Sequence, residues 1–473
     1  MNSVVVLVVV LVNFLISFGS TEFVLEKFHR EPPPPEVKST RVIKEQWISQ
    51  LVDHFDVNNH GQWSMRYYAN DEFYQPGGPI FIFVGGEWDI SPNRVQGGHM
   101  YDMAKEFNGS LFYIEHRFYG KSRPTLDLSV SNLKLLTSEQ ALADLAHFIQ
   151  VKKIEIPEAA ESPVFLVGAS YSASLVTWFS HKYPTLVTGA WASSAPLEAR
   201  TNFKDFLEVV SQSIILVSVE CKDRISEAMR EMERLANSGN YTHLSRMAHL
   251  CEELTDDNRL DRWLVFQQMA FYVAIVVQYG NPISIEELIC NPIMSEPDAL
   301  TGFSKFIEKS AQGCIVNEFE KAYRSYRNTT WAGNPSITRQ WIFQTCNEFG
   351  WFQTSESPNQ PFSSIPVEYY EEICKYLFGE DFHLEMIDHS VCLTNVKYNG
   401  LNPNVRNVYS THGNLDPWKA AGALEYINHE SPTYIIPNYS HCSDLNSIEP
   451  SDSIPLIGSK IRIKDLIKAW GNL

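Results

Sequence analysis

Positive charge is scarce in this 473-residue chain, which has 38 Lys and Arg against 56 Asp and Glu and a formal net charge of −18. An acidic surface repels the phosphates of nucleic acids and of anionic membranes, so we expect no nucleic-acid partner. Long apolar runs are also missing. The run over residues 4–16, broken only by Asn13, is shorter than the roughly 20 residues that span a bilayer, so we expect no stable membrane anchor.

Several motifs of metal and cofactor chemistry are absent. The sequence contains no Cys-x-x-Cys pair, no His-Glu-x-x-His zinc signature and no Gly-x-Gly-x-x-Gly dinucleotide fingerprint. Gly120-Lys121-Ser122 is similar to the end of a P-loop, but Glu115 stands where that motif needs its first glycine. We therefore expect neither a metal nor a cofactor.

The amino terminus has the pattern of a secretory signal. Residues 1–19 carry no charged side chain, and Ser17 and Gly19 are small residues at positions −3 and −1 of a cleavage site. The four prolines from Pro32 to Pro35 then favour an extended conformation, so residues 20–46 are predicted to form an extended arm. We expect a protein of the secretory pathway, either secreted or lysosomal.

Cysteines and glycosylation sequons agree with that compartment. The secretory pathway is oxidising, so the 8 cysteines are expected to form disulfides, and the sequence leaves their pairing open. All of them but Cys442 lie between Cys221 and Cys392. Four asparagines stand in Asn-x-Ser/Thr sequons and are predicted glycosylation sites: Asn108, Asn240, Asn328 and Asn438.

Apolar runs alternate with helical patterns in the first half of the chain. Runs over residues 79–84, 111–114, 163–167 and 186–192 have the continuous apolar character of strands buried on both faces. A helical pattern over residues 138–154 separates the second run from the third. This alternation predicts an α/β domain with a mainly parallel sheet, whose first part covers residues 47–200.

The rhythm stops over residues 201–388, which are rich in helix formers and aromatic residues and hold most of the cysteines. We interpret this segment as a helical cap inserted into the sheet domain, and the short apolar run 271–277 inside it as a buried helix. Strand-like runs return at 405–411 and 433–436, and helices are predicted over 418–428 and 461–470. Residues 389–473 are thus expected to complete the sheet.

The third apolar run leads directly into a turn of small residues around Ser170, followed by a helical pattern. This strand, turn and helix context is typical of a nucleophile elbow, although Ser172 replaces the second glycine of Gly-x-Ser-x-Gly. A serine needs an imidazole to take its proton and a carboxylate to orient the imidazole. Asp416 and His441 follow the last two strand-like runs in the order Ser, Asp, His of α/β-hydrolases, which predicts a triad.

The loop after the first apolar run supplies the remaining candidates. Backbone N–H groups of Tyr171 and Gly86 are predicted to form the oxyanion hole. Glu87, Trp88 and Asp89 follow Gly86 and are candidate substrate-binding residues, since a carboxylate there could bind the free amine of a peptide or tune the histidine. His412 competes with His441 as the base, but it precedes Asp416, so we assign it a structural role.

Six strings along the chain together resemble one family of serine peptidases. The family is the serine carboxypeptidase family that includes lysosomal Pro-X carboxypeptidase, dipeptidyl peptidase II and thymus-specific serine protease. The resemblance implies an α/β-hydrolase fold interrupted by a helical cap, the triad Ser170, Asp416 and His441, and cleavage of short peptides, often next to proline. The strings are Gly85-Gly86-Glu87, Glu115-His116-Arg117-Phe118-Tyr119-Gly120, Gly168-Ala169-Ser170-Tyr171, Ala192-Ser193-Ser194-Ala195-Pro196, Asp416-Pro417-Trp418 and His441-Cys442.

Two other functions share parts of this pattern. A lipase or esterase of the same fold would use the same triad, and an inactive hydrolase-like protein would bind peptides without cutting them. The sequence favours a serine-type exopeptidase acting on peptide substrates. It leaves open whether the enzyme removes residues from the amino or the carboxyl end, and whether it forms a homodimer.

Overall fold

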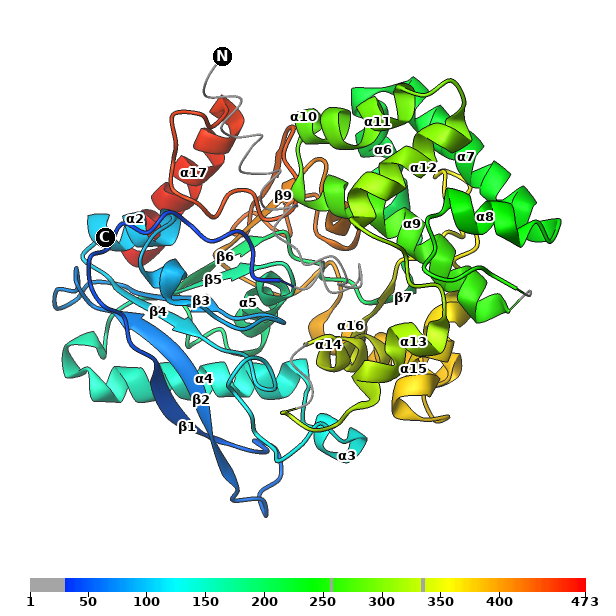
Figure 1. Ribbon diagram of the computed structural model, residues 1–473. Coiled ribbons are helices and arrows are strands. Elements are labelled where there is room, and N and C mark those ends of the chain that lie inside the picture. Colours follow the sequence, from blue (N-terminus) through cyan, green and yellow to red (C-terminus); the bar gives the residue numbers. More distant parts are fainter. Residues whose placement is uncertain (1–29, 256–257, 333–336) are drawn as a thin grey trace.

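The computed structural model describes residues 30–255, 258–332 and 337–473, so the predicted signal peptide lies outside the described residues. Its centre is an eight-stranded sheet in the order β1-β2-β4-β3-β5-β6-β9-β10 (Figure 1). β2 is antiparallel to both of its neighbours, β1 and β4, and every other pair of neighbouring strands in this sheet is parallel. The predicted α/β-hydrolase fold is confirmed. The strands are β1 Gln46–Leu51, β2 Gln62–Asn70, β3 Ile80–Val84, β4 Ser110–Ile114, β5 Val164–Ala169, β6 Gly189–Ser193, β9 Val408–Gly413 and β10 Thr433–Ile436.

Helices cover both faces of this sheet because its central strands are apolar on both faces. Alternate side chains of β3 point to opposite sides: Phe81 and Phe83 pack in one apolar cluster, and Ile80 and Ile82 in the other. The first cluster is completed by α2 (His99–Glu106) and α17 (Ile454–Gly471). The second is completed by α4 (Ser138–Glu155) and α5 (Tyr171–Lys182).

Two local features of the structure differ from what the sequence led us to expect. The hairpin β1–β2 was not predicted, because its strands have exposed positions and lack a continuous apolar run. The helix predicted over 418–428 is only a short 3-10 turn, η7 (Pro417–Ala421). It ends at Gly422, where the chain is extended and a Cβ would lie 2.3 Å from Cε1 of His412, so close packing on His412 takes precedence over helix propensity.

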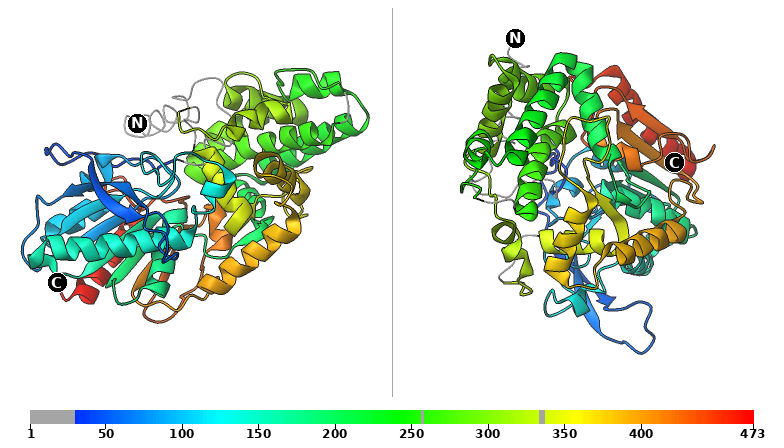
Figure 2. Two further views of the ribbon diagram at one scale, coloured as in Figure 1. Left: turned by 90° about the horizontal axis from the view of Figure 1, so that it is seen from below. Right: turned by 90° about the vertical axis from the view of Figure 1, so that its right-hand side faces the viewer.

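Between β6 and β9 the chain is almost entirely helical. A small second sheet pairs β7 (Arg200–Asn202) with β8 (Gly350–Phe352), and the helices gather on one side of the main sheet (Figures 1 and 2). The predicted boundary at residue 388 falls inside α16, so the helical segment ends at Tyr398. Its helices are α6 Asp205–Val217, α7 Val219–Asn237, α8 Tyr241–Met247, α9 Arg259–Tyr279, α10 Pro282–Ile285, α11 Asn291–Met294, α12 Ala299–Ala311, α13 Phe319–Tyr323, α14 Thr338–Gln344, α15 Val367–Phe378 and α16 Leu384–Tyr398.

Short helical turns complete the description. Two of them, η4 and η6, are π-helical and continue α10 and α14. They and the remaining short elements are α3 Val130–Leu133, η2 Pro92–Val95, η3 Pro157–Ala159, η4 Glu286–Cys290, η5 Arg324–Arg327 and η6 Thr345–Phe349.

Helix α9 is the core of the helical segment. By length and composition it is the one helix of the described chain that could span a membrane, yet 78% of its apolar stretch is buried inside the protein. It contains the run 271–277, which was predicted to be a buried helix. Its buried side chains belong to the same apolar cluster as Ile80 and Ile82 of β3, so α9 extends the core of one sheet face into the helical segment.

Three disulfides staple this segment: Cys221–Cys290, Cys251–Cys314 and Cys346–Cys374. Cys392 on α16 is unpaired and exposed, whereas Cys442 is unpaired and buried. The four sequon asparagines are all exposed, as glycosylation requires, and their modification remains a prediction.

Breaking one staple should loosen the helical segment and leave the sheet intact. We expect the double substitution Cys221→Ser and Cys290→Ser to cost about 2–4 kcal/mol, since the bond closes a long loop of the unfolded chain. Hydrogen exchange would rise in α7 and α12 and stay unchanged in β3 and β5. Cys392→Ser is the matched control and should change neither. Equal loosening of the central strands would contradict the local effect expected of this disulfide.

Candidate active site

Ser170 occupies the sharp turn between β5 and α5. Its backbone has φ 55° and ψ −130°, a conformation that costs free energy in any residue other than glycine. The amide of Ser170 donates a hydrogen bond to the carbonyl oxygen of Ser193 at 2.9 Å, which ties the turn to the end of β6. The turn therefore places Ser170 at the carboxyl edge of the sheet.

The residues around Ser170 leave no spare room. A Cβ on Gly168 would lie 2.3 Å from the carbonyl oxygen of Ser172, so only glycine fits there. The hydroxyl of Ser172 accepts a hydrogen bond from the amide of Ala169 and donates one to its carbonyl oxygen, both at 2.9 Å. Serine is therefore accommodated where the common motif has glycine, because strand β5 takes up the extra hydroxyl. Sequence reasoning assigned no role to this hydroxyl.

Asp416 and His441 form a buried pair. Nδ1 of His441 lies 2.9 Å from Oδ1 of Asp416, and the same oxygen accepts the amide of Trp418 at 3.0 Å. Burial alone would raise the pKa of Asp416, but the attraction of His441 prevails and lowers it. Burial would lower the pKa of His441, yet Asp416 raises it above the ordinary value. The pair thus has the orientation and charge preference of a histidine held by a carboxylate.

The helical segment closes directly over this pair. The amide of His441 donates to the carbonyl oxygen of Gln278 at 3.0 Å, and Nε1 of Trp418 donates to Oε1 of Gln278 at the same distance. The hydroxyl of Ser440 donates to the carbonyl oxygen of Val277 at 2.7 Å. Three hydrogen bonds therefore hold the end of α9 against the loops that carry Asp416 and His441.

The end of β6 connects the serine turn to the histidine loop. Ser193 accepts the amide of Ser170 through its carbonyl oxygen, while the hydroxyl of Ser194 accepts the amide of Cys442 at 2.9 Å. Buried Asp444 accepts the hydroxyls of Ser193 and of Thr411. These supporting residues were not predicted as part of the site. Sequence reasoning could have suspected only Ser193 and Ser194, which lie in one of the quoted strings.

The loop after β3 is tightly packed. A Cβ on Gly86 would lie 2.6 Å from the ring of Trp88, which is buried and donates its Nε1–H to the hydroxyl of Tyr113 at 2.7 Å. Asp89 is 64% exposed and pairs with Arg66. Glu87 is only 4% exposed, and its Oε2 has no hydrogen-bond partner among the described residues. Burial raises the pKa of Glu87 to about 7, against a smaller opposing effect of His441.

His412 is enclosed behind the Asp416 loop. It is fully buried, and neither ring nitrogen has a hydrogen-bond partner within the described ranges. Burial lowers its pKa to about 4, which keeps the ring neutral. Unlike His441, it makes no hydrogen bond to the carboxylate of Asp416.

Ser170, Asp416 and His441 follow β5, β9 and β10, whose carboxyl ends meet at one edge of the sheet. Asp416 and His441 are in contact, whereas no hydrogen bond joins Ser170 to His441 in the described parts of the chain. Such bonds are often long without substrate and tighten in the reacting complex. The arrangement can therefore support acyl transfer once a substrate closes the remaining gap.

A family model described as Serine carboxypeptidase S28 matches residues 50–463. The chain belongs to this family. Mouse thymus-specific serine protease is 31% identical over 456 residues, which are 91% of this chain and 88% of that protein. Bovine lysosomal Pro-X carboxypeptidase is 29% identical over 450 residues, 90% of this chain and 87% of that protein. The predicted family is confirmed, and this S28 member is a serine peptidase.

A solved structure of the proline iminopeptidase of Mycobacterium smegmatis is also similar. It has 13% identity and a TM-score of 0.39, and the match covers 89% of this chain and 99% of that one.

Removing the Ser194 hydroxyl should disturb the histidine loop of this S28 peptidase. We expect Ser194→Ala to cost about 1–3 kcal/mol, because the buried amide of Cys442 would lose its acceptor. Ser410→Ala on β9 is the matched control, since its hydroxyl is equally buried and has no hydrogen-bond partner among the described residues. Urea unfolding of both variants measures the difference. Equal stability losses would show that the hydrogen bond to Cys442 contributes nothing specific.

Proposed function

We propose that this S28 peptidase is an exopeptidase that cuts short peptides through the triad Ser170, His441 and Asp416. The observation that carries the proposal is the buried contact of 2.9 Å between His441 and Asp416, at the same sheet edge as the strained turn of Ser170. A serine in such a turn, with a carboxylate-held imidazole nearby, is the arrangement that acyl transfer requires.

The reaction would proceed in two balanced steps. The hydroxyl oxygen of Ser170 attacks the scissile carbonyl carbon while Nε2 of His441 takes the hydroxyl proton. His441 then gives that proton to the leaving amine, the carbon–nitrogen bond breaks, and an acyl ester remains on Ser170. In the second step water, deprotonated by His441, attacks the ester carbonyl; the bond to Ser170 breaks, His441 returns the proton to the Ser170 oxygen, and the acid leaves. Asp416 keeps its charge throughout and stabilises the imidazolium.

The backbone N–H groups of Tyr171 and Gly86 are the proposed oxyanion donors. Tyr171 is the first residue of α5, so its amide belongs to an amino-terminal turn where N–H groups are not used by the helix itself. Gly86 follows β3, the strand next to β5, and the ring of Trp88 fills the space of its missing side chain. Both donors would act in a site from which water is largely excluded.

Glu87 is the substrate-facing residue that the geometry favours. It is buried near His441 with one unpartnered carboxylate oxygen, so a peptide group with a hydrogen to donate would find an acceptor there. Trp88 and Asp89 are engaged by Tyr113 and Arg66, and the proposal gives them no direct contact with substrate. If Glu87 binds the free amine of a substrate, the enzyme removes residues from the amino end; if Glu87 instead tunes His441, the amino end has no such anchor.

An aromatic cavity beside the Asp416 loop can take an apolar side chain. Apart from Trp418, its aromatic walls belong to the helical segment. Such a surface suits a compact ring such as that of proline, in keeping with the name of the Pro-X carboxypeptidases that resemble this chain. Its aromatic residues are Phe271, Tyr323, Trp341, Trp351, Phe352, Tyr370 and Trp418.

The helical segment is the proposed cap that limits substrate length. Its helix α9 makes three hydrogen bonds to the Asp416 and His441 loops, so one side of the site is walled by protein. A walled site admits a chain end more readily than the middle of a folded protein. The proposal includes peptide substrates, entry into the secretory pathway and residence in the lysosome or outside the cell, and leaves a homodimer as a question for hydrodynamic measurement.

Replacing the nucleophile should abolish activity without unfolding the protein. We expect Ser170→Ala and His441→Ala each to leave less than about one part in 10³ of the peptidase activity, because the triad acts as one unit. His412→Ala should keep most of kcat, since the neutral ring has no proposed part in proton transfer. A fluorophosphonate probe should label the wild type and not Ser170→Ala. Labelling of Ser170→Ala would reveal another nucleophile, and an unlabelled wild type would favour a binding protein.

Substrate length separates the exopeptidase from its rivals. Mass spectrometry of a peptide library should show losses from one chain end only, with short peptides cut fastest. Long-chain acyl esters should be poor substrates, because a lipase needs a lipid-facing apolar lid that peptide hydrolysis does not. Rapid cleavage of internal bonds in long chains would contradict the cap, and faster turnover of lipid esters would favour an esterase.

A further inference from the structure

The N-terminal arm is firmly seated on the sheet domain. Residues 31–44 form neither helix nor strand, yet Arg94, which is 3% exposed, donates hydrogen bonds to the carbonyl oxygens of Pro32 at 2.6 Å and Pro33 at 2.8 Å. A Cβ on Gly97 would lie 2.0 Å from the carbonyl oxygen of Glu36. The arm thus supplies two acceptors to a buried guanidinium and presses against a backbone that has no room for a side chain.

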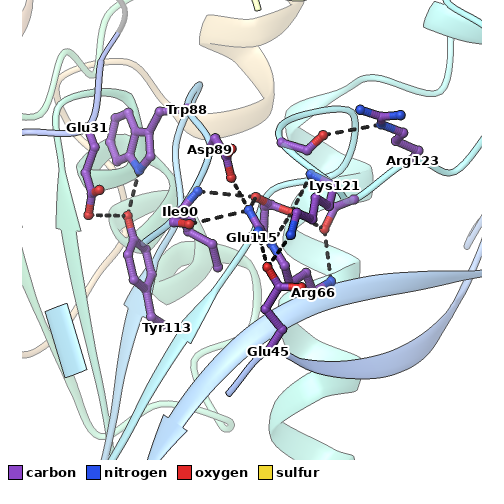
Figure 3. A network of polar contacts seen from close by, with 12 residues as sticks. Glu31, Glu45, Arg66, Trp88, Asp89, Ile90, Tyr113, Glu115, Lys121 and Arg123 are labelled. Carbon is purple, nitrogen blue, oxygen red and sulfur yellow. Dashed lines mark hydrogen bonds and ion pairs between the residues drawn. The ribbon is translucent and has the colours of Figure 1, made fainter. Parts of the chain in front are cut away.

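From this seat the arm reaches the loop after β3 through a directed chain of hydrogen bonds. Glu31 has a side chain that is mostly buried and accepts the hydroxyl of Tyr113 at 3.1 Å. Tyr113 in turn accepts the indole N–H of Trp88 at 2.7 Å. Figure 3 shows the carboxylate of Glu31 and the indole of Trp88 meeting at the hydroxyl of Tyr113. Each donor in the chain has one acceptor, so a carboxylate of the arm is linked to Trp88 through the hydroxyl of Tyr113.

Trp88 transmits this position to the proposed oxyanion donor. Its ring lies against Gly86 so closely that a Cβ on Gly86 would be 2.6 Å from two ring atoms. A shift of the indole would therefore move the Gly86 backbone or leave a gap beside it, and interiors packed at this density pass on small displacements.

The same loop is held from its other end, again with help from the arm. Glu115 accepts the amide of Ile90 at 3.2 Å and pairs with buried Arg66, which also pairs with Asp89. Glu45, near the end of the arm, accepts from Arg66 at 2.9 Å (Figure 3). Two carboxylates of the arm thus reach the two sides of the loop.

We propose that the N-terminal arm is a retained part of the active peptidase, and that Glu31, Tyr113 and Trp88 are positioning residues for the oxyanion donor on Gly86. This inference rests on the proposed function for its catalytic consequence. The chain of contacts also requires that the arm stay attached, because its removal would leave the buried guanidinium of Arg94 and the hydroxyl of Tyr113 without the acceptors described above.

The experiment compares Tyr113→Phe, which keeps the ring but removes the hydroxyl, with Glu31→Ala, which removes the acceptor in the arm. Glu31→Gln retains a carbonyl oxygen as acceptor and should restore most of what Glu31→Ala loses. Glu36→Ala is the matched control, since Glu36 is an exposed residue of the same arm. The readouts are hydrogen exchange of residues 85–90, kcat and KM on a short peptide, and the intact mass of the secreted chain.

Tyr113→Phe and Glu31→Ala should each speed exchange in residues 85–90 and lower kcat on the order of tenfold at nearly constant KM, because a displaced donor weakens only the transition state. The double variant should lose no more than the worse single variant, because both residues act through one chain. The mature mass should include Glu31.

Unchanged exchange in residues 85–90, or a mature chain that begins after Glu31, would overturn the proposal. Exchange reports on the loop whether or not the enzyme acts through Ser170. If exchange rises as expected while Ser170→Ala keeps its activity, the positioning role stands and the proposed mechanism fails. If Ser170→Ala abolishes activity while exchange in residues 85–90 stays unchanged in Tyr113→Phe and Glu31→Ala, the proposed mechanism stands and the positioning role fails.

Discussion

The buried pair of His441 and Asp416 is the constraint on which the surrounding structure depends. A carboxylate removed from water is tolerated only with a partner and well-placed hydrogen bonds, and Asp416 has His441 at 2.9 Å and the amide of Trp418 at 3.0 Å. Keeping water away requires a cover. The end of α9 provides it through Gln278, which binds both the histidine loop and the indole of Trp418. The inserted helices and the sheet are thus joined where charge is buried.

The loops at the sheet edge are held by buried polar groups more than by regular structure. The string that begins at Glu115 illustrates this. Arg117 forms two hydrogen bonds with buried Asp144, at 2.6 and 2.8 Å, while Glu115 holds Arg66. His116 and Gln344 both reach the hydroxyl of Tyr171, at 3.1 and 3.0 Å. A string that carries the family resemblance therefore supports the serine turn and ties it to the helical segment.

The arm and the helical segment are far apart in the sequence and support different loops of the site. The arm is linked through Tyr113 of β4 to the loop with Gly86, and α9 contacts the loops with Asp416 and His441. Neither element contains a residue of the proposed triad. Each instead adds hydrogen bonds near a loop of the site, and strained turns such as that of Ser170 persist only where their surroundings determine them.

The sequence by itself determined the central parallel strands and the order of the site residues. Runs such as 79–84 and 163–167 must be buried on both faces, and a parallel sheet brings their carboxyl ends together, so Ser170, Asp416 and His441 could be assigned to one edge before any coordinates. A local apolar run carries this information because every residue of a strand that is covered on both faces is buried.

Only the tertiary structure decided the partners. Each of these contacts joins residues that are far apart in the chain. They are the disulfides, the hydrogen bonds accepted by Ser194 and Asp444, and the hydrogen bonds that link Trp88 to Tyr113 and Tyr113 to Glu31. The same limit applies to residues that are close in the sequence. The hydroxyl of Ser172 is explained only by its hydrogen bonds to the backbone of Ala169, and the end of η7 at Gly422 only by the His412 ring packed against it. A single sequence records which residues can pair, while close packing selects which ones do.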